Sequence, residues 1–413
     1  MKKFLIIVLV ALMLTSCGMW VRDPVEAQED EPRVTTSNSR KNKAPTADIS
    51  KLDLENVIEE FPALGEYDIV AEFGHYFCGY DYSIMAGDGS NFYYYTSSGD
   101  KVEPVAVSED LSNEILYGLR YSCVASGGDL YLLTRPFGDE NRLCLVKIDG
   151  EGLKAELLGE IPFTLERTIL TTLIPIDGGV ILTAKDTDVD FDVDPFVRYC
   201  TFTAWLYDGE KGFREVINES MSEDDAPDSS GVEVFSVFIK DDELWAVGRG
   251  KKDGKNEVAV LRYDFFGNFL GVKRIVNCDE SDKLCDMLYI AQCAYQIGDG
   301  IGVGIYNGDH AIIKDGGYTY IENVHNVRNT EFFLTYELEV EKLPVNENNY
   351  YIKSVTLYDL ESGESRAIPD VDSANGRAVH IRAIEDGFLI NVKTEDSMTY
   401  LKVTNETLKM LFE

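Results

Sequence analysis

The stretch "GGDLYLLTR", from Gly127 to Arg135, joins a tight glycine–aspartate turn to an apolar strand. Such turn residues tolerate positive φ angles, and apolar residues at every second position are typical of a strand with one face more buried than the other. The same phrase returns as "DGGVILTAK" from Asp177, "DDELWAVGR" from Asp241, "GDGIGVGIY" from Gly298 and "EDGFLINVK" from Glu385. An apolar stretch precedes each turn, so each phrase predicts a β-hairpin.

A second phrase follows each hairpin and ends another strand in a turn. Examples are "LVKIDGEG", "WLYDGEKG", "VLRYDFFGN", "AIIKDGG" and "VTLYDLESG". Their aspartates are Asp149, Asp208, Asp264, Asp315 and Asp359, which lie 59, 56, 51 and 44 residues apart. Weaker copies occur in "YYYTSSGD" and "YLKVTNE". A short strand follows each turn, so the repeating unit contains four strands.

Four-stranded units at a period of about 40 to 60 residues resemble the blades of a β-propeller. Counting the second phrase predicts seven blades, with six and eight left open. The hairpin phrase is missing between Ile301 and Phe388, a gap wide enough for two units, and "EFFLTYELEVEKLPVNENNYYIKSVTLYD" predicts the irregular one. A pair of β-sandwiches is the alternative fold, but sandwiches would not keep one four-strand phrase along the chain.

Two elements are expected before the first blade. "SKLDLENVIEEFP" predicts a helix from Ser50 to Pro62, because its apolar residues recur at helical spacing between an N-cap and a proline stop. "GEYDIVAEF", from Gly65, is a candidate for the closing strand that pairs with the last blade.

The N-terminus carries a secretion signal. Lys2 and Lys3 precede an apolar run from Phe4 to Leu14, which is about half of the roughly 20 residues that a membrane-spanning helix needs. "LTSC" then resembles the lipobox of bacterial lipoproteins. The resemblance implies cleavage after Ser16 and diacylation of Cys17, whose acyl chains would anchor the protein in a membrane.

The resemblance and the composition divide the chain into three parts. Residues 1–16 are the predicted signal peptide, and residues 17–47 are rich in charged and polar residues and predict a flexible tether. Residues 48–413 form the predicted propeller domain. The expected location is extracytoplasmic, with the lipid anchor in the bacterial cell membrane or the outer membrane.

The chain is strongly acidic. It contains 73 Asp and Glu residues against 38 Lys and Arg residues, a net charge of −35. This balance argues against binding nucleic acid through general electrostatics and favours solubility, cations or basic partners.

The predicted loops differ between the two faces of the propeller. The turns between strands one and two, and between strands three and four, are short. Long insertions fall on the opposite face, between strands two and three or between blades, as in "KDTDVDFDVDPFVRY" and "NESMSEDDAPDSSG". Rigid scaffolds commonly carry function on such loops, so this acidic face is the predicted binding face for a protein or glycan ligand.

Five alternating aspartates stand out on that face. In an extended strand Asp186, Asp188, Asp190, Asp192 and Asp194 would point to one side. Asp186, Asp188 and Asp190 are the candidate ligands of a Ca²⁺ ion. The spacing fails the EF-hand pattern, which needs Gly at its sixth position and Glu at its twelfth, so a solvated acidic edge is the favoured interpretation and no cofactor is expected.

The basic stretch "GRGKKDGKN" is expected on the same face. Its residues Arg249, Lys251 and Lys252 join Asp192 and Asp194 as candidate binding residues. Neutralising the neighbouring acids is the simpler role, and holding an anionic group of a ligand is the alternative.

Signals for catalysis are few. His380 and Arg382 lie two residues apart on the expected innermost strand of the last blade, so both would face the central channel. The corresponding column in other blades is small and polar, with Ser122, Thr172, Ser236 and Cys293. A polar channel wall is the favoured interpretation, and His380 as a general base is the alternative.

The cysteines predict little cross-linking. Seven remain after Cys17, an odd number. Cys278 and Cys285 flank a short acidic segment and are the candidates for a disulfide.

The sequence therefore predicts a lipid-anchored propeller that binds a protein, a peptide or a glycan. The alternative is an extracytoplasmic lyase or hydrolase acting at the channel mouth. A deep pocket that gathers His380, Arg382 and a carboxylate would favour the enzyme.

Overall fold

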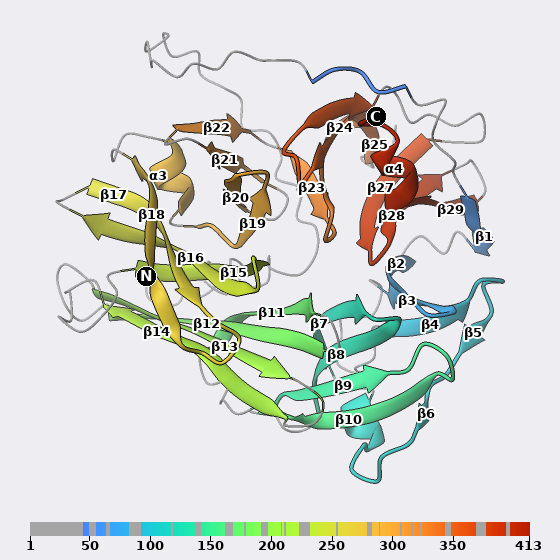
Figure 1. Ribbon diagram of the computed structural model, residues 1–413. Coiled ribbons are helices and arrows are strands. Elements are labelled where there is room, and N and C mark those ends of the chain that lie inside the picture. Colours follow the sequence, from blue (N-terminus) through green and yellow to red (C-terminus); the bar gives the residue numbers. More distant parts are fainter. Residues whose placement is uncertain are drawn as a thin grey trace, which may run out of the picture. The chain divides into compact units, whose positions relative to one another are not determined.

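The computed structural model forms two units, residues 1–41 and 42–413. It describes residues 44–48, 55–62, 67–81, 92–116, 119–136, 142–161, 168–176, 179–190, 197–207, 209, 212–222, 232–252, 255–278, 283–288, 290–305, 308–314, 317–322, 324–342, 348–368, 377–393 and 397–413. All of these belong to the second unit, which is a seven-bladed β-propeller (Figure 1). The predicted blade number and the four-stranded unit are confirmed.

The first three blades follow the predicted phrases. Blade 1 contains β2 (Tyr67–Phe73), β3 (Tyr76–Asp81), β4 (Phe92–Thr96) and β5 (Lys101–Val102). Blade 2 contains β7 (Leu119–Ser126), β8 (Asp129–Arg135), β9 (Cys144–Ile148) and β10 (Lys154–Glu160), with the short β6 (Val105–Ala106) pairing in parallel outside β10. Blade 3 contains β11 (Thr168–Ile176), β12 (Gly179–Asp190), β13 (Val197–Tyr207) and β14 (Phe213–Ser222).

The next three blades repeat this antiparallel order. Blade 4 contains β15 (Val232–Lys240), β16 (Glu243–Lys252), β17 (Lys255–Tyr263) and β18 (Phe269–Cys278). Blade 5 contains β19 (Cys293–Ile297), β20 (Gly300–Gly304), β21 (His310–Lys314) and β22 (Gly317–Ile321). Blade 6, the predicted irregular unit, contains β23 (His325–Arg328), β24 (Phe332–Lys342), β25 (Asn348–Asp359) and β26 (Ser365–Ile368).

Blade 7 combines both ends of the second unit. Its inner strands are β27 (Arg377–Ile384), β28 (Gly387–Lys393) and β29 (Ser397–Thr404), and its outermost strand is β1 (Glu55–Pro62). The prediction of a helix for residues 50–62 is therefore wrong over residues 55–62, which form a strand. Pairing with the open edge of β29 satisfies the backbone of β1, and two irregularities in its register disturb the alternation that normally marks a strand.

The predicted closing strand was placed one element too late. β2, within "GEYDIVAEF", is the innermost strand of blade 1, and β1 closes the ring instead. Pro45 and Ala47, at the end of the predicted tether, exchange backbone hydrogen bonds of 2.8 Å with Ala367 of β26.

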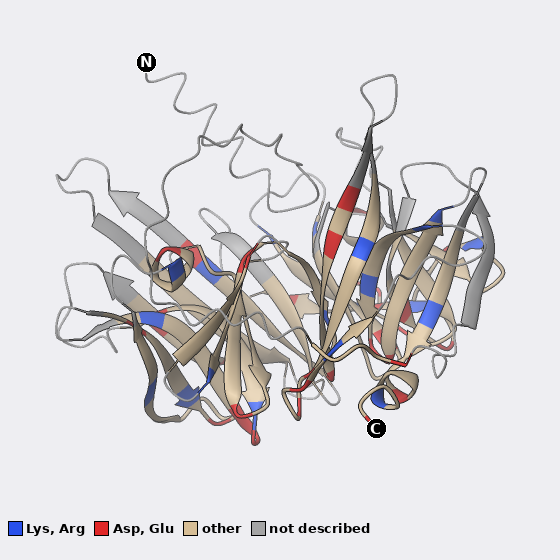
Figure 2. Ribbon diagram, turned by 90° about the horizontal axis from the view of Figure 1, so that it is seen from above, with Lys and Arg blue, Asp and Glu red and all other residues tan. Residues whose placement is uncertain are grey.

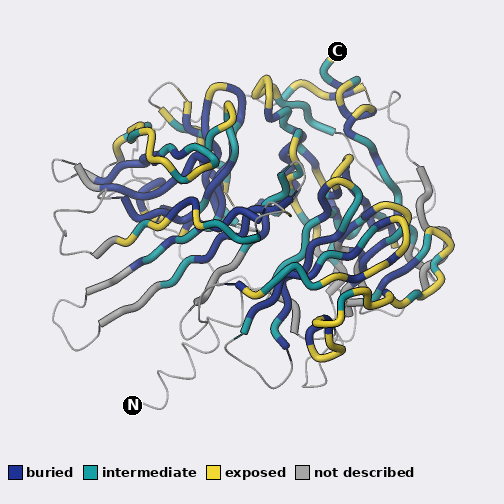
Figure 3. The backbone as a smooth tube through the Cα atoms, turned by 60° about the horizontal axis from the view of Figure 1, so that its bottom comes forward, coloured by how far each residue is buried: buried dark blue, intermediate teal, exposed yellow. Residues whose placement is uncertain are grey.

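The apolar core lies between the blades. Seven clusters of buried side chains each join two neighbouring blades. The cluster of Ile69, Phe77, Tyr95, Ile384, Leu389 and Tyr400 joins blade 7 to blade 1 and so completes the ring. Figure 3 shows buried residues along the middle of the strands and exposed residues at the turns. Each blade therefore depends on its neighbours for burial of its faces.

Three short helices complete the described structure. They are α2 (Asn113–Leu116), α3 (Lys283–Leu288) and α4 (Asn405–Lys409). The side chain of Thr404 accepts a hydrogen bond from the Thr407 amide and caps α4, which follows β29 on the face of the short turns. Among the described residues, no helix is long and apolar enough to cross a membrane.

Candidate functional site

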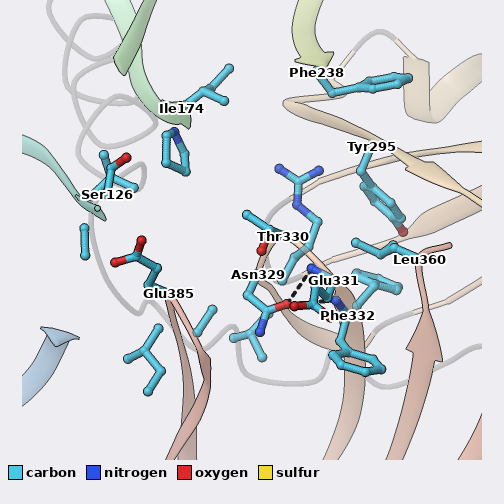
Figure 4. A pocket seen from close by; sticks show the side chains of 18 of the residues that line it. Ser126, Ile174, Phe238, Tyr295, Asn329, Thr330, Glu331, Phe332, Leu360 and Glu385 are labelled. Atoms are coloured by element: carbon cyan, nitrogen blue, oxygen red, sulfur yellow. Dashed lines mark hydrogen bonds between the residues drawn. The ribbon is translucent and has the colours of Figure 1, made fainter. Parts of the chain in front are cut away.

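A cavity of 1310 Å³ occupies the propeller channel (Figure 4). The innermost strands of the blades supply its walls, and the turns that follow them supply its mouth. Ser126, Ile176, Ile239, Gln296, Asn329 and Glu385 stand at or beside these turns. The cavity therefore reaches the face of the short turns, opposite the face that carries the long predicted insertions.

One wall holds a carboxylate on backbone amides. Glu385, in the turn between β27 and β28, accepts hydrogen bonds from the amides of Gly127 and Gly128 at 2.8 and 3.3 Å. The two glycines have φ angles of 61° and 81°, and the positive φ turns both amides outward. Blade 7 is thereby tied to blade 2 across the inner end of blade 1.

Another part of the lining holds a guanidinium. Arg328, at the end of β23, donates to the carbonyl of Ala294 at 3.1 Å, and its Cζ lies 5.3 Å from the centre of the Tyr295 ring. Figure 4 shows Glu385 beside Ser126 on one side of the cavity, with Tyr295, Thr330 and Leu360 across from them.

Three other carboxylates of the lining already have partners. Glu72 binds Lys402 at 2.8 and 2.9 Å through its two carboxylate oxygens. Glu331 forms an ion pair with Lys409 of α4 and accepts from Asn405 at 3.2 Å. Asp359 accepts the amides of its own turn. These carboxylates hold the mouth together instead of presenting charge to a ligand.

Asn329 organises the mouth in blade 6. Its side-chain oxygen accepts the amides of Glu331 and Phe332 at 2.9 and 2.8 Å. Its amide group donates to the carbonyl of Gly387 in blade 7 and to Asn405, the first residue of α4, which follows that blade. The turn after β23 is therefore fixed relative to the neighbouring blade.

A buried histidine supports the wall behind Tyr295. His310 has no exposed surface, and its Nδ1 lies 3.3 Å from the Tyr295 hydroxyl. Burial lowers the pKa of His310 from 6.5 to about 4, because desolvation disfavours the imidazolium. The ring is therefore neutral at pH 7.

We expect the stability of the propeller to fall below pH 6.5 because of His310. The unfolded chain binds a proton near pH 6.5 and the folded chain only near pH 4, so the stabilisation present above 6.5 is lost as the pH falls towards 4. The linkage predicts a loss of about 2 kcal/mol between pH 7 and pH 5. Urea unfolding of the chain and of His310→Gln at both pH values measures it. An equal pH dependence in the two proteins would contradict the assignment.

The two predicted channel residues do line the cavity. His380 and Arg382 lie on β27, and the Nδ1 atom of His380 lies 3.1 Å from the carbonyl oxygen of Ile381. Glu385, on the same strand–turn unit, lines the same cavity. A histidine, an arginine and a carboxylate of one strand–turn unit therefore line the same cavity.

The described cysteines are free thiols, and the disulfide predicted between Cys278 and Cys285 is not formed. Cys285 is buried in α3, where its sulfur accepts a hydrogen bond of 2.9 Å from Asn256. The side chain of Cys278 lies outside the described residues. Cys293 lines the cavity, and burial raises the pKa of its thiol to about 11, so it is protonated at neutral pH.

The acidic face is described only in part. Asp186, Asp188 and Asp190 belong to β12, which is longer than the predicted strand, and the side chain of Asp186 is half-buried. The side chains of Asp188 and Asp190, and the whole of Asp192 and Asp194, lie outside the described residues. No group of three metal-ligating side chains occurs among the residues that are described. The Ca²⁺ site therefore stays a prediction.

The basic stretch is a hairpin rather than an open loop. β16 and β17 continue through it, and the side chains of Lys251 and Lys252 lie outside the described residues. Arg249 is 6% exposed and binds the buried Glu233 at 2.7 Å. Arg249 is therefore not part of a binding surface, because its partner holds it between blades 3 and 4. Described acidic and basic residues are scattered over the blades (Figure 2).

Comparison with known proteins finds distant similarity to solved structures. No protein-family model and no curated protein matches the chain. Among solved structures, Sqt1 of Saccharomyces cerevisiae is 10% identical with a TM-score of 0.39, covering 86% of this chain and 100% of that chain. The β-propeller domain of the Trilobed protease from Pyrococcus furiosus is 12% identical with a TM-score of 0.37, covering 69% and 82%. Puromycin hydrolase is 12% identical with a TM-score of 0.42, covering 82% and 52%.

Proposed function

We propose that this protein is an extracytoplasmic, lipid-anchored propeller whose channel binds a peptide segment of a partner protein. The observation that supports the proposal is the 1310 Å³ cavity, whose apolar walls carry charges of both signs at the mouth. Pockets for single small molecules usually measure roughly 300 to 1,000 Å³. The larger cavity suits an extended ligand of several residues.

The lining favours a peptide over a glycan. Sugar rings commonly stack on exposed aromatic faces, but the aromatic side chains here are buried. Phe238, Tyr295 and Phe333 are 6%, 2% and 1% exposed. The walls instead offer aliphatic side chains, including Val124, Ile174 and Ile239. Such a surface matches the apolar side chains of a peptide.

The lipobox and the polar segment after it support the location. Two acyl chains on Cys17 would anchor the chain stably, since each buried CH₂ contributes about 0.8 kcal/mol. The segment from residue 18 to about residue 44 would then lift the propeller from the lipid surface. In this arrangement the cavity meets partners in the cell envelope.

Filling the cavity should abolish peptide binding. The soluble mature chain carrying Cys17→Ser is screened against a random peptide display library, and enriched peptides are tested by titration. Thr172→Trp adds an indole inside the channel, so we expect its affinity to fall at least tenfold. The control Glu156→Trp places the same side chain at an exposed position of β10 and should bind normally. Equal binding by both variants, with unchanged melting, would reject the cavity as the site.

A hydrolase or lyase acting at the channel mouth is the second candidate. The gathering of His380, Arg382 and Glu385 in one cavity favours it, because a general base beside charged groups can activate water. Mass spectrometry of the enriched peptides after incubation tests this candidate. Cleavage that disappears in His380→Gln would establish an enzyme. Intact peptides that stay bound would support the binding protein.

A further inference from the structure

Two charges of opposite sign in the cavity lining have no counter-charge among the described residues. Arg328 ends β23 of blade 6, and Glu385 lies in the turn after β27 of blade 7. Among the described residues, neither side chain forms an ion pair, although the paired carboxylates of Glu72 and Glu331 lie in the same lining. Glu385 and Arg328 are therefore a negative and a positive group able to meet a ligand, beside the exposed Glu361, which also lines the cavity.

Backbone groups hold both charges in place. The Gly127 and Gly128 amides fix the Glu385 carboxylate, and a carboxylate has about four acceptor sites, so two remain for a ligand. The Ala294 carbonyl and the Tyr295 ring fix the Arg328 guanidinium, which has five N–H donors and uses one in that bond. Neither partner neutralises the charge that it holds. Side chains ordered in advance lose less entropy on binding.

We infer that the peptide bound in this channel is dipolar, with an acidic group on Arg328 and a basic group on Glu385. The inference rests on the proposed function and names the chemistry of its ligand. A ligand of one sign would satisfy one of the two groups and be repelled by the other. A neutral ligand would desolvate both charges without replacing their water. Charges of both signs therefore select a peptide that carries both.

The library peptides test this chemistry. We expect enriched sequences to contain one acidic and one basic residue. For an enriched peptide, Arg328→Gln should weaken binding about tenfold, the usual scale of a charge-assisted hydrogen bond, and so should replacing the peptide's acidic residue with its amide. The two changes together should cost little more than either alone. Glu385→Gln and the peptide's basic residue should behave in the same way.

Matched variants separate charge from folding. Lys154→Gln and Glu156→Gln remove charges of the same two signs from exposed positions of β10 and should bind normally. Arg328→Lys keeps the positive charge and should retain most of the affinity, and Arg328→Glu should enrich peptides without the acidic residue. If peptides bind but the paired changes add independently, this inference fails while the proposed function stands. If no peptide binds more tightly than it does to Thr172→Trp, the proposed function fails.

Discussion

Cys17→Ser should release the protein completely from the membrane fraction while leaving the propeller folded. Cys17 is the residue on which the lipobox resemblance places both acyl chains, and serine has no thiol to carry the diacylglyceryl group. Without these chains, the anchoring free energy of about 0.8 kcal/mol per buried CH₂ is lost. Cys17 precedes the unit that begins at residue 42, so the core of the propeller does not depend on it. Labelling with a radioactive fatty acid measures the acylation of residue 17, and fractionation measures release from the membrane.

A second cysteine variant serves as the control. Cys278→Ser changes a cysteine far from the signal peptide, so this protein should still incorporate the label and sediment with membranes. Circular dichroism and a thermal melt of the released Cys17→Ser protein should match those of the anchored chain after detergent extraction. Label in Cys17→Ser, or sedimentation that resists high salt, would show that the chain is held in another way.

The blades could be predicted because their information is local. A hairpin turn, its two strands and the next turn lie within one repeat, and each repeat copies the same chemistry. Even the irregular blade 6 was placed, since "VTLYDLESG" carries the same aspartate turn. In the structure Asp359 accepts hydrogen bonds from the amides of Glu361 and Ser362, so the predicted aspartate turn is present.

Closure of the ring could not be predicted in the same way. β1 pairs with β29, which lies more than 300 residues later in the chain. Its own pattern fits a helix, and only the open edge of blade 7 makes a strand the better solution. "GEYDIVAEF" reads correctly as a strand, but nothing local shows whether it begins a blade or closes one.

Part of the site could be predicted from local sequence, and part depends on contacts between distant segments. His380 and Arg382 were predicted to face the channel because the period of the strand fixes their side. The sequence did not predict that Arg328 and Glu385 line the cavity. They lie in turns of blades 6 and 7, and only the closed ring places both turns at one cavity. The acidic insertions predicted a binding face on the side of the long loops, whereas the cavity opens at the face of the short turns.

Arg249 was predicted to be a binding residue, but the structure buries it. Its sequence neighbours are lysines and glycines, which suggest an exposed loop. The structure instead places its guanidinium against Glu233 of β15, and both residues are 6% exposed. Lys185 of β12 also reaches Glu233, at 3.1 Å, and the thiol of Cys200 lies 3.2 Å from the same oxygen. One carboxylate therefore joins blade 4 to blade 3.

Breaking this cluster should cause a large loss of stability. Removing one partner of a buried ion pair costs about 3 to 5 kcal/mol when the remaining charge is left uncompensated. Lys185 still pairs with Glu233 at 3.1 Å after the change, so we expect Arg249→Met to lower the free energy of unfolding by a smaller amount, about 1 to 3 kcal/mol. Lys101→Ala, which breaks an exposed pair with Glu103 at 3.9 Å, should lower it by less than about 1 kcal/mol. Urea unfolding of the two variants gives the comparison.

The double variant Arg249→Met with Glu233→Leu decides whether charge or packing is responsible. If the loss arises because the Glu233 carboxylate keeps only Lys185 as a counter-charge, replacing it with an apolar side chain should restore most of the stability, since buried ion pairs are often no more stabilising than apolar residues of similar volume. Lys185 would lose its partner too, but at 11% side-chain exposure its long aliphatic stem lets the ammonium move towards water. If the double variant is less stable than Arg249→Met, the cluster stabilises the interface by its own attraction. If Arg249→Met itself costs no more than Lys101→Ala, Glu233 does not depend on Arg249 and the buried arrangement is wrong.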